Sequence, residues 1–321
     1  MDDILIIGSG PAGYTAAIYA ARAGRSTKII TGPQPGGQLI KMSLLENYSG
    51  FSDPISGLAL MDQMKQQAEK MGVIIVSDII KSVDFSKSPF RCTGELNTTY
   101  ESKTLIIATG ANAKWLGIPG EDKYLGAGVS ACAVCDGFFF RNKNVAVVGG
   151  GNTAVEEAMY LTNFAQSVVL VHRGDKLRAE QIMQKRLEKN PKVEIMWNTR
   201  VVNIFGDGNK VTELLLTSTR NNMEIRKAID GVFVAIGHQP ATSIFEGQLE
   251  VDENGYIVTN KANSATSIPG IFAAGDVCNP NYRQAIVSAG QGCVAALDAD
   301  RFLSGERQEY SQQCKEQNYL R

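Results

Sequence analysis

Two of the six cysteines, Cys132 and Cys135, are separated by two residues and form the only closely spaced pair in the chain. This spacing brings both sulfurs within reach of a disulfide if the segment is helical, as in redox-active dithiols. Ser130 is suited to cap such a helix and would put Cys132 in its first turn, where the helix dipole favours the thiolate that attacks disulfides. Asp136 directly follows Cys135 and is a candidate proton donor or acceptor.

A structural zinc ion is the other use of a C-x-x-C pair. Such an ion takes four ligands, usually with a second C-x-x-C or a Cys/His pair. The chain has no second C-x-x-C, and its two histidines, His172 and His238, are not spaced to complete a site. We therefore expect no metal. The remaining cysteines are expected to be buried apolar residues or inert surface thiols: Cys92, Cys278, Cys293 and Cys314.

Two glycine-rich segments have the pattern of phosphate-binding loops. Residues 8–13 (GSGPAG) follow an apolar run at 4–7, and residues 149–154 (GGGNTA) follow an apolar run at 145–148; each precedes a helix-forming stretch. Glycine permits the tight turn and the close approach of a pyrophosphate, which rests at the positive end of the helix dipole. One such loop is weak evidence, but two, each between a strand and a helix, predict two dinucleotide-binding domains.

The residues that follow the second strand of each unit indicate which nucleotide it prefers. An NAD site usually ends that strand with Asp or Glu, which binds the ribose 2′-hydroxyl. The second unit instead continues with His172, Arg173 and, a few residues later, Arg178. Guanidinium groups bind a 2′-phosphate, so this turn favours NADP, with a solvated basic turn as the alternative. The first unit ends in Thr31 and Gly32 without a basic cluster, so we expect it to bind a different nucleotide.

Size and charge narrow the possible functions. The 321 residues allow about two domains. With 32 basic and 33 acidic residues, the net charge of −1 gives no electrostatic reason to expect nucleic acid or an anionic membrane as a partner. The chain starts with acidic rather than basic residues, and no apolar run approaches the roughly 20 residues that span a bilayer. We expect a cytoplasmic protein with neither kind of partner.

Taken together, these motifs resemble those of the low-molecular-weight thioredoxin reductases, and the resemblance covers essentially the whole chain. Beyond the loops and the C-A-V-C-D-G stretch, the matching segments are residues 31–38, 149–157, 274–277 and 282–285. The resemblance implies an α/β fold with two Rossmann-like domains, in which an NADPH domain is inserted into a discontinuous FAD domain. Residues 1–114 and 245–321 would form the FAD domain, and residues 115–244 would form the NADPH domain carrying the C-x-x-C pair.

That family consists of homodimers that bind FAD tightly and reduce thioredoxin with NADPH, and the resemblance implies the same here. Cys135 would be nearest the flavin, Cys132 would attack thioredoxin, and Asp136 would be the acid/base. The residues that would bind FAD are Ser9, Gly10, Pro11, Ala12, Thr31, Gly32, Gly36, Gly37, Gln38, Asn47, Asp276, Arg283, Gln284 and Ala285. Those that would bind NADPH are Gly151, Asn152, Thr153, Ala154, His172, Arg173 and Arg178. The family commonly has arginine where this chain has Gly174, so we expect a weaker preference for NADPH.

The order of the motifs also predicts motion. The cysteine pair and the second glycine loop both fall within residues 115–244, and both must approach the flavin. Since two groups on one rigid body cannot easily occupy one place, we expect the domains to rotate between two states about hinges near 113–115 and 242–245.

Other functions share part of this pattern. A flavin-dependent dithiol oxidase of the same fold would need no NADPH site. A ferredoxin–NADP reductase of this fold lacks the C-x-x-C pair. A regulatory nucleotide-binding protein that only senses the redox state would need no cysteine pair beside the flavin.

Overall fold

The computed structural model describes residues 1–42, 45–260 and 262–305, and the chain divides into two compact units. Among the described residues, unit 1 comprises 1–112 and 239–305, and unit 2 comprises 113–238. The crossings lie at 112–113 and 238–239, rather than at 114–115 and 244–245 as we expected. The second lies earlier because β16 (His238–Pro240) already pairs with β7 (Ala111–Ala113), and the next residue, Ala241, donates its N–H to the carbonyl of Gly110 at 3.0 Å.

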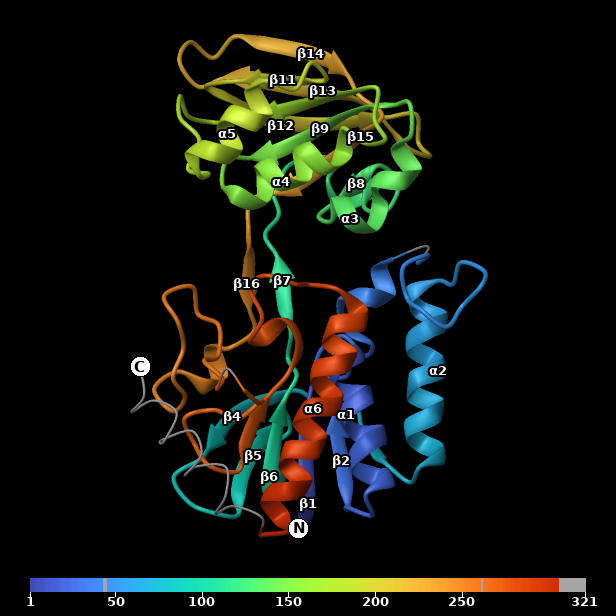
Figure 1. Ribbon diagram of the computed structural model, residues 1–321, viewed down its shortest axis with the longest axis vertical. Coiled ribbons are helices and arrows are strands. Elements are labelled where there is room, and N and C mark those ends of the chain that lie inside the picture. The colour runs from blue at the N-terminus through green and yellow to red at the C-terminus, as the bar shows by residue number, and fades with distance from the viewer. Residues whose placement is uncertain (43–44, 261, 306–321) are drawn as a thin grey trace. The chain divides into compact units, whose positions relative to one another are not determined.

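Unit 1 is built on a seven-stranded sheet with the order β3-β2-β1-β6-β5-β4 and with β17 beside β6 (Figure 1). The strands β3, β2, β1, β6 and β17 are parallel, whereas β5 runs antiparallel to both β6 and β4. The strand bounds are β1 Asp2–Ile7, β2 Thr27–Ile30, β3 Ile74–Val76, β4 Ile80–Asp84, β5 Phe90–Gly94, β6 Thr99–Ile107 and β17 Ile271–Ala273. The helices are α1 Pro11–Arg22, α2 Gly57–Lys70, α6 Ala285–Leu303 and the 3-10 turns η1 Gly37–Lys41, η4 Ser243–Phe245 and η5 Gly275–Val277.

The first strand shows why this sheet is buried on both faces. Ile4 and Ile6 pack into the core under α1, α2 and α6, whereas Leu5 and Ile7 pack into the core on the opposite face. A continuous apolar run is typical of such a parallel strand. Helices α1 and α6 lie side by side on one face of the sheet (Figure 1). They approach so closely that a Cβ on Gly292 would lie 2.1 Å from the carbonyl oxygen of Ala12.

Unit 2 contains a five-stranded parallel sheet, β11-β10-β9-β15-β8, and a three-stranded antiparallel sheet, β12-β13-β14 (Figure 1). The strand bounds are β8 Val129–Ser130, β9 Asn144–Gly149, β10 Ser167–Val171, β11 Val193–Met196, β12 Thr199–Gly206, β13 Val211–Ser218, β14 Glu224–Ala228 and β15 Gly231–Ala235. The helices are α3 Ala133–Asp136, α4 Asn152–Leu161, α5 Gln181–Glu188 and the 3-10 turns η2 Asp122–Tyr124 and η3 Gly137–Phe140. Val145 and Val147 of β9 pack in the core that contains α4, and Ala146 and Val148 pack in the core that contains β13.

Each unit therefore presents a strand, a glycine loop and a helix in immediate succession. In unit 1 these are β1, residues 8–10 and α1; in unit 2 they are β9, residues 150–151 and α4. The carboxyl ends of parallel strands meet at one edge of a sheet, and ligands of open α/β sheets bind outside that edge.

Candidate active site

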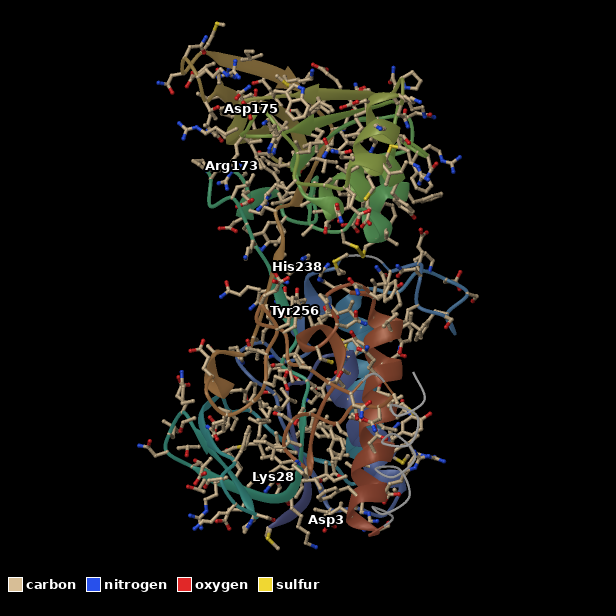
Figure 2. All side chains as sticks on the ribbon, turned by 60° about the vertical axis from the view of Figure 1, so that its left-hand side comes forward. Asp3, Lys28, Arg173, Asp175, His238 and Tyr256 are labelled. Atoms are coloured by element: carbon tan, nitrogen blue, oxygen red, sulfur yellow. A yellow bond between two sulfur atoms is a disulfide. The ribbon has the colours of Figure 1, made fainter. Side chains whose placement is uncertain are left out.

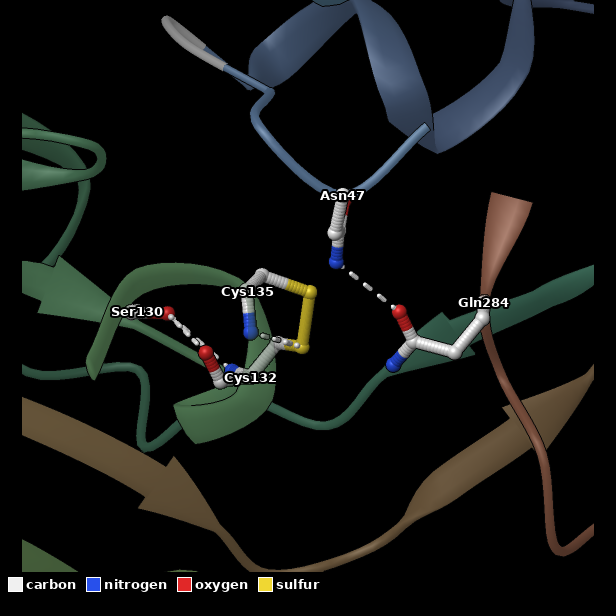
Figure 3. The surroundings of a disulfide bond; sticks show 5 residues. All are labelled: Asn47, Ser130, Cys132, Cys135 and Gln284. Carbon is white, nitrogen blue, oxygen red and sulfur yellow. Dashed lines mark hydrogen bonds between the residues drawn. A yellow bond between two sulfur atoms is a disulfide. The ribbon is translucent and has the colours of Figure 1, made fainter. Parts of the chain in front are cut away.

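Cys132 and Cys135 form a disulfide, with an S–S distance of 2.09 Å and Cα atoms 5.3 Å apart. Helix α3 begins at Ala133, so the prediction that Ser130 caps a helix containing Cys132 is wrong. Cys132 itself occupies the cap position, and its Sγ accepts a hydrogen bond from the backbone N–H of Cys135 at 3.2 Å (Figure 3). Ser130 lies two residues before the cap position, and its Oγ instead accepts from the backbone N–H of Cys132 at 3.0 Å. An N–H directed at this sulfur also stabilises a thiolate once the disulfide is reduced.

Asp136, the last residue of α3, carries the carboxyl group closest in sequence to the disulfide. Burial raises the pKa of this carboxyl, and a hydrogen bond with Ser130 acts in the opposite direction. A raised pKa keeps more of the carboxyl protonated near neutral pH than is usual for aspartate. This suits a group that delivers a proton to a thiolate and later removes one.

The cysteines outside the pair have a different character. Burial raises the pKa of the Cys92 thiol to about 12, and burial together with the nearby Asp276 carboxylate raises that of Cys278 to about 12. Both thiols stay protonated and unreactive at neutral pH. Cys293 lies half-buried on α6, and Cys314 lies outside the described residues. Within the described ranges, no group of three or more His, Cys, Asp or Glu side chains is arranged to hold a metal ion.

The glycines of the first loop differ in how much space surrounds the position that a Cβ atom would occupy. A Cβ on Gly8 would lie 2.2 Å from the carbonyl oxygen of Ala108, and one on Gly13 would lie 1.9 Å from that of Gly8. The packing of the chain itself therefore requires both glycines. At Gly10, by contrast, no atom of the described chain lies within 4 Å of the Cβ position. Since Gly10 precedes the N-terminus of α1, its bare backbone is open to a ligand where a pyrophosphate would bind.

A buried serine connects this loop to the segment after β2. The Oγ of Ser9 donates to the carbonyl of Thr31 at 2.8 Å and accepts from the N–H of Gly36 at 3.0 Å. A Cβ on Gly37 would lie 3.3 Å from the Cα of Gly10, so the two loops lie against each other. The structure thus brings most of the first group of predicted residues together. Its other members here are Pro11 and Ala12, at the start of α1, and Gly32 and Gln38, in the second loop.

The turn η5 reaches the same place from the far end of the chain. A Cβ on Gly275 would lie 3.0 Å from the Cβ of Ala12, so this turn lies against the start of α1. Two side chains of α6, which sequence reasoning missed, hold it there. Ser288 Oγ donates to Asp276 Oδ1 at 2.9 Å, and Gln291 Oε1 accepts from the N–H of Gly275 at 3.0 Å. Their spacing on one face of the otherwise apolar first part of α6, residues 285–297, was the available signal.

The segment before α6 contains a half-buried cation, Arg283, with unused hydrogen-bonding capacity. Arg283 Nη2 lies 3.5 Å from the hydroxyl of Tyr256, whereas its buried Nε has no hydrogen-bond partner in the described part of the chain. Buried polar atoms are nearly always bonded, so this one fits a ligand with an acceptor group. Asn47 Nδ2 donates to Gln284 Oε1 at 3.2 Å, and Ala285 begins α6 (Figure 3).

The glycines of the second loop divide as those of the first do: two are required by packing, and one borders open space. A Cβ on Gly149 would lie 2.4 Å from the carbonyl oxygen of Ala235, and one on Gly150 would lie 2.3 Å from the ring of His172. Around the Cβ position of Gly151, the described residues leave open space to 4 Å. Gly151 precedes the N-terminus of α4, so its backbone is also open to a ligand. Helix α4 then begins with the predicted residues Asn152, Thr153 and Ala154.

Two contacts join this loop to the basic turn at residues 172–178, a third lies within the turn, and a fourth joins α4 to the residues just after the turn. The ring of His172 places Nδ1 2.9 Å from the carbonyl oxygen of Gly149 and Nε2 2.8 Å from that of Lys176. The N–H of Arg178 donates to the carbonyl of Gly150 at 2.7 Å. Farther along, Asn152 Oδ1 accepts from the N–H of Glu180 at 2.9 Å. Both ring nitrogens of His172 therefore face backbone carbonyls, so His172 positions the turn.

The guanidinium groups of Arg173 and Arg178 belong to exposed side chains on this turn, and Figure 2 shows Arg173 beside Asp175 on unit 2. Because the backbone of the turn is fixed to the glycine loop, a nucleotide whose pyrophosphate lies at Gly151 has positive charge available for its adenosine end. The structure therefore offers one glycine loop with a basic turn and one without.

Known proteins are similar to this chain along most of its length. The sequence model of the pyridine nucleotide-disulphide oxidoreductases matches residues 2–292. A thioredoxin reductase of Rickettsia bellii is 52% identical over 303 residues, covering 94% of this chain and 98% of that protein. One from Vibrio cholerae is 52% identical over 310 residues, covering 94% and 97%. The crystal structure of a thioredoxin reductase from Streptococcus pyogenes superposes with a TM-score of 0.90 at 43% identity, covering 95% and 99%.

The chain belongs to the thioredoxin reductase family. This confirms the predicted fold class, family and enzyme class. Membership of the thioredoxin reductases favours a disulfide reductase over the dithiol oxidase and the regulatory protein that share part of the pattern. In the stretches that the structure describes, none of the helices is both long and apolar enough to cross a membrane.

Proposed function

We propose that this chain transfers electrons from NADPH, through FAD and the Cys132–Cys135 disulfide, to the disulfide of thioredoxin. The observation that carries the proposal is that unit 2 combines this disulfide with a glycine loop fixed to a basic turn. Unit 1 supplies a second glycine loop without such a turn. A reductase needs one nucleotide to deliver electrons, one to relay them and a dithiol to pass them on.

FAD fits unit 1. Its pyrophosphate would lie at Gly10 and Pro11, at the N-terminus of α1, and Arg283 Nε and the carboxyl of Asp276 would bond its polar groups. When bound, the flavin accepts a hydride and passes an electron pair to a disulfide. The chain's own contribution is to hold it: the Ser9 bonds fix the loop at residues 31–38, and Ser288 orients Asp276. Asn47, joined to Gln284, would complete the site.

NADPH fits unit 2. Its pyrophosphate would lie at residues 151–154, at the N-terminus of α4, and its 2′-phosphate would lie at Arg173 and Arg178. Arginine binds phosphate through two parallel N–H bonds, which NADH cannot accept at its 2′-hydroxyl. His172 holds the two binding segments together through Gly149 and Lys176.

The thiol chemistry follows from the arrangement of α3. After reduction, the thiolate of Cys132 attacks one sulfur of the thioredoxin disulfide, and the other sulfur leaves and takes up a proton. The thiolate of Cys135 then attacks Cys132 Sγ, which re-forms the internal disulfide and releases thioredoxin as a dithiol. Asp136 delivers and removes the protons, and its raised pKa, caused by burial, suits both steps.

Turnover requires motion of one unit against the other. Hydride transfer needs the nicotinamide within about 3–3.5 Å of the reactive flavin atom, and disulfide reduction needs similar proximity. Both groups belong to unit 2, so they must take turns at the flavin, by rotation about the crossings at 112–113 and 238–239. A cross-link between the units, placed away from the active site, should collapse turnover while FAD is retained. A locked protein that turns over at the unlocked rate would contradict this motion.

The functional form is a cytoplasmic homodimer. Ile286, Val294 and Leu297 are 43%, 44% and 43% exposed and share one face of α6, and Tyr19 of α1 is 43% exposed. An apolar face of this kind is covered when a second copy packs on it. The reactive dithiol also needs a reducing compartment, such as the cytoplasm, so that it can be reduced and oxidised repeatedly.

The proposal is tested by following NADPH consumption with and without oxidised thioredoxin. We expect consumption only when thioredoxin is present, and none with Cys132→Ser or Cys135→Ser. The two variants should differ in colour: with Cys132 replaced, the Cys135 thiolate next to the flavin should give a long-wavelength absorption band, and with Cys135 replaced the band should be absent. NADPH oxidation that depends on oxygen but not on thioredoxin would favour an oxidase.

A further inference from the structure

The hairpin that connects β13 to β14 brings a third arginine to the basic turn, from a part of the sequence far from Arg173 and Arg178. The hairpin turn spans residues 219–222, and its shape is fixed by its own bonds. The N–H of Arg220 donates to Ser218 Oγ at 3.3 Å, and the N–H of Met223 donates to Asn221 Oδ1 at 3.1 Å. Ser218 and Met223 close the hairpin with a 2.9 Å backbone bond. Arg220 therefore extends from a defined position.

This hairpin turn is attached to the basic turn by its neighbour, Thr219. The Oγ1 of Thr219 donates to the carbonyl of Arg173 at 3.2 Å, and its N–H donates to the carbonyl of Asn198 at 2.6 Å. Asn198 in turn donates its own N–H to the carbonyl of Gly174 at 2.9 Å. Two of the three contacts thus end on the backbone of the residues that would face the 2′-phosphate.

The side chain of Arg220 points toward this turn. Its Nη2 lies 4.0 Å from Asp175 Oδ2, and the two side chains are 68% and 65% exposed. An ion pair at this distance and exposure contributes little, so the guanidinium is free to exchange the carboxylate for a stronger anion. A phosphate dianion with three acceptor oxygens is such an anion.

Gly174 leaves room for this exchange. A Cβ at Gly174 would have three atoms of the His172 ring as its nearest neighbours, at 3.1, 3.6 and 3.9 Å. No side chain at position 174 therefore competes with Arg220 for the space beside Arg173. Through Arg220, the hairpin supplies the positive charge that Gly174 lacks.

We infer that Arg220 is a specificity-determining residue that binds the 2′-phosphate of NADPH together with Arg173 and Arg178. This inference rests on the proposed use of NADPH. Asp175 pairs weakly with Arg220 when the nucleotide is absent, so it competes with the phosphate for this guanidinium.

The test compares Arg220→Ala with Arg226→Ala. Arg226 is a matched control, because it is an exposed arginine of the same hairpin, on β14, and pairs with Glu213 at 2.6 Å. We expect Arg220→Ala to lower kcat/KM for NADPH by about three- to tenfold and to leave kcat/KM for NADH unchanged, since one exposed charged contact is lost. Arg226→Ala should change neither value.

Binding of 2′,5′-ADP gives a readout that needs no turnover. Arg220→Ala should weaken it by a similar factor and leave binding of 5′-AMP unchanged. Asp175→Asn should tighten 2′,5′-ADP binding when Arg220 is present and have a smaller effect in the Arg220→Ala background, because contacting residues are not additive.

The Arg173→Ala variant distinguishes a wrong role for Arg220 from a wrong choice of nucleotide. If Arg173→Ala reduces the preference for NADPH and Arg220→Ala does not, the role of Arg220 is wrong while the use of NADPH stands. If the unmodified protein does not prefer NADPH and neither variant changes that, the proposed nucleotide is wrong and the inference is overturned with it.

Discussion

The two glycine loops are nearly the same structure, joined to different surroundings. In each, the first glycine is required by packing against a neighbouring strand, and the one before the helix, Gly10 or Gly151, borders open space. In unit 1 the loop is fixed by a serine hydroxyl, Ser9, to a segment without basic side chains. In unit 2 it is fixed by the ring of His172 to a turn with two arginines. We therefore propose that the glycines determine that a dinucleotide binds and that the attached segment determines which dinucleotide it is.

The largest expected effect comes from adding one methyl group to the open glycine of unit 1, with the same change in unit 2 as its counterpart. Both residues have negative φ, −72° at Gly10 and −94° at Gly151, so alanine is compatible with the backbone. Gly10→Ala should abolish flavin retention because the Cβ occupies the space of the pyrophosphate, and the protein should purify colourless. Gly151→Ala should purify yellow, with kcat/KM for NADPH lowered about tenfold or more.

Each variant is the control for the other, since each carries the same change in the equivalent place. Flavin content and nucleotide kinetics, measured side by side, decide the result. If both variants lose flavin equally, the loops do not have separate ligands and the comparison between the units fails.

An effect smaller than that of Gly10→Ala is expected from Asp136, the proposed proton donor and acceptor of unit 2. Asp136→Asn should lower thioredoxin reduction about a hundredfold, within the range of general acid–base catalysis. Burial raises the pKa of this carboxyl, so as an acid it should lose activity as the pH rises through that raised pKa. The variant should show no such decline. A pH–rate profile with the same shape for both proteins would exclude Asp136 as the proton donor.

The equivalent carboxyl in unit 1 makes this contrast sharper. Burial also raises the pKa of Asp276, and a serine, Ser288, opposes the shift as Ser130 does at Asp136. The same physical environment thus occurs in both units. Only Asp136 lies next to a disulfide, so we assign proton transfer to Asp136 and flavin binding to Asp276.

Arg173→Ala should have an effect of about tenfold on the preference for NADPH over NADH, because one charge-assisted phosphate contact is removed. The ratio of kcat/KM for the two nucleotides measures it. We expect kcat to stay near its original value, since the lost contact lies far from the reacting atoms. An unchanged ratio would show that the basic turn does not distinguish the second loop from the first.

The smallest effect concerns stability. A carboxyl whose pKa is raised in the folded state contributes stability that is fully present below its unfolded pKa of about 3.9 and is lost as the pH rises through the folded value. The Asp136→Asn variant has no carboxyl to titrate, so it does not lose this stability as the pH rises. The melting temperature of the variant relative to the original protein should therefore increase with pH across this window and level off above it. A difference that is constant with pH would place the Asp136 carboxyl in ordinary solvent.

Local features of the sequence predicted much of this arrangement. Apolar runs marked the buried parallel strands, and the glycines required by packing, such as Gly8 and Gly149, marked the turns that follow them. The contacts that join a loop to a distant segment were not predictable, since they depend on the fold. The sequence did not show that the ring of His172 faces two backbone carbonyls, or that Arg220 reaches the basic turn through the β13–β14 hairpin. We expected Ser130 to cap the helix at the cysteine pair, but this short helix, α3, begins only at Ala133.

In the proposed cycle, electrons pass from the nucleotide of unit 2 to that of unit 1 and back to the disulfide of unit 2. Anaerobic titration of the purified protein with NADPH, followed by oxidised thioredoxin, tests it most directly. The account predicts that the unmodified protein takes up one electron pair for the disulfide and one for the flavin, whereas Cys132→Ser takes up only the second. Thioredoxin should then restore the flavin colour of the unmodified protein alone. Equal uptake by both proteins, or a flavin that thioredoxin cannot reoxidise, would contradict the account.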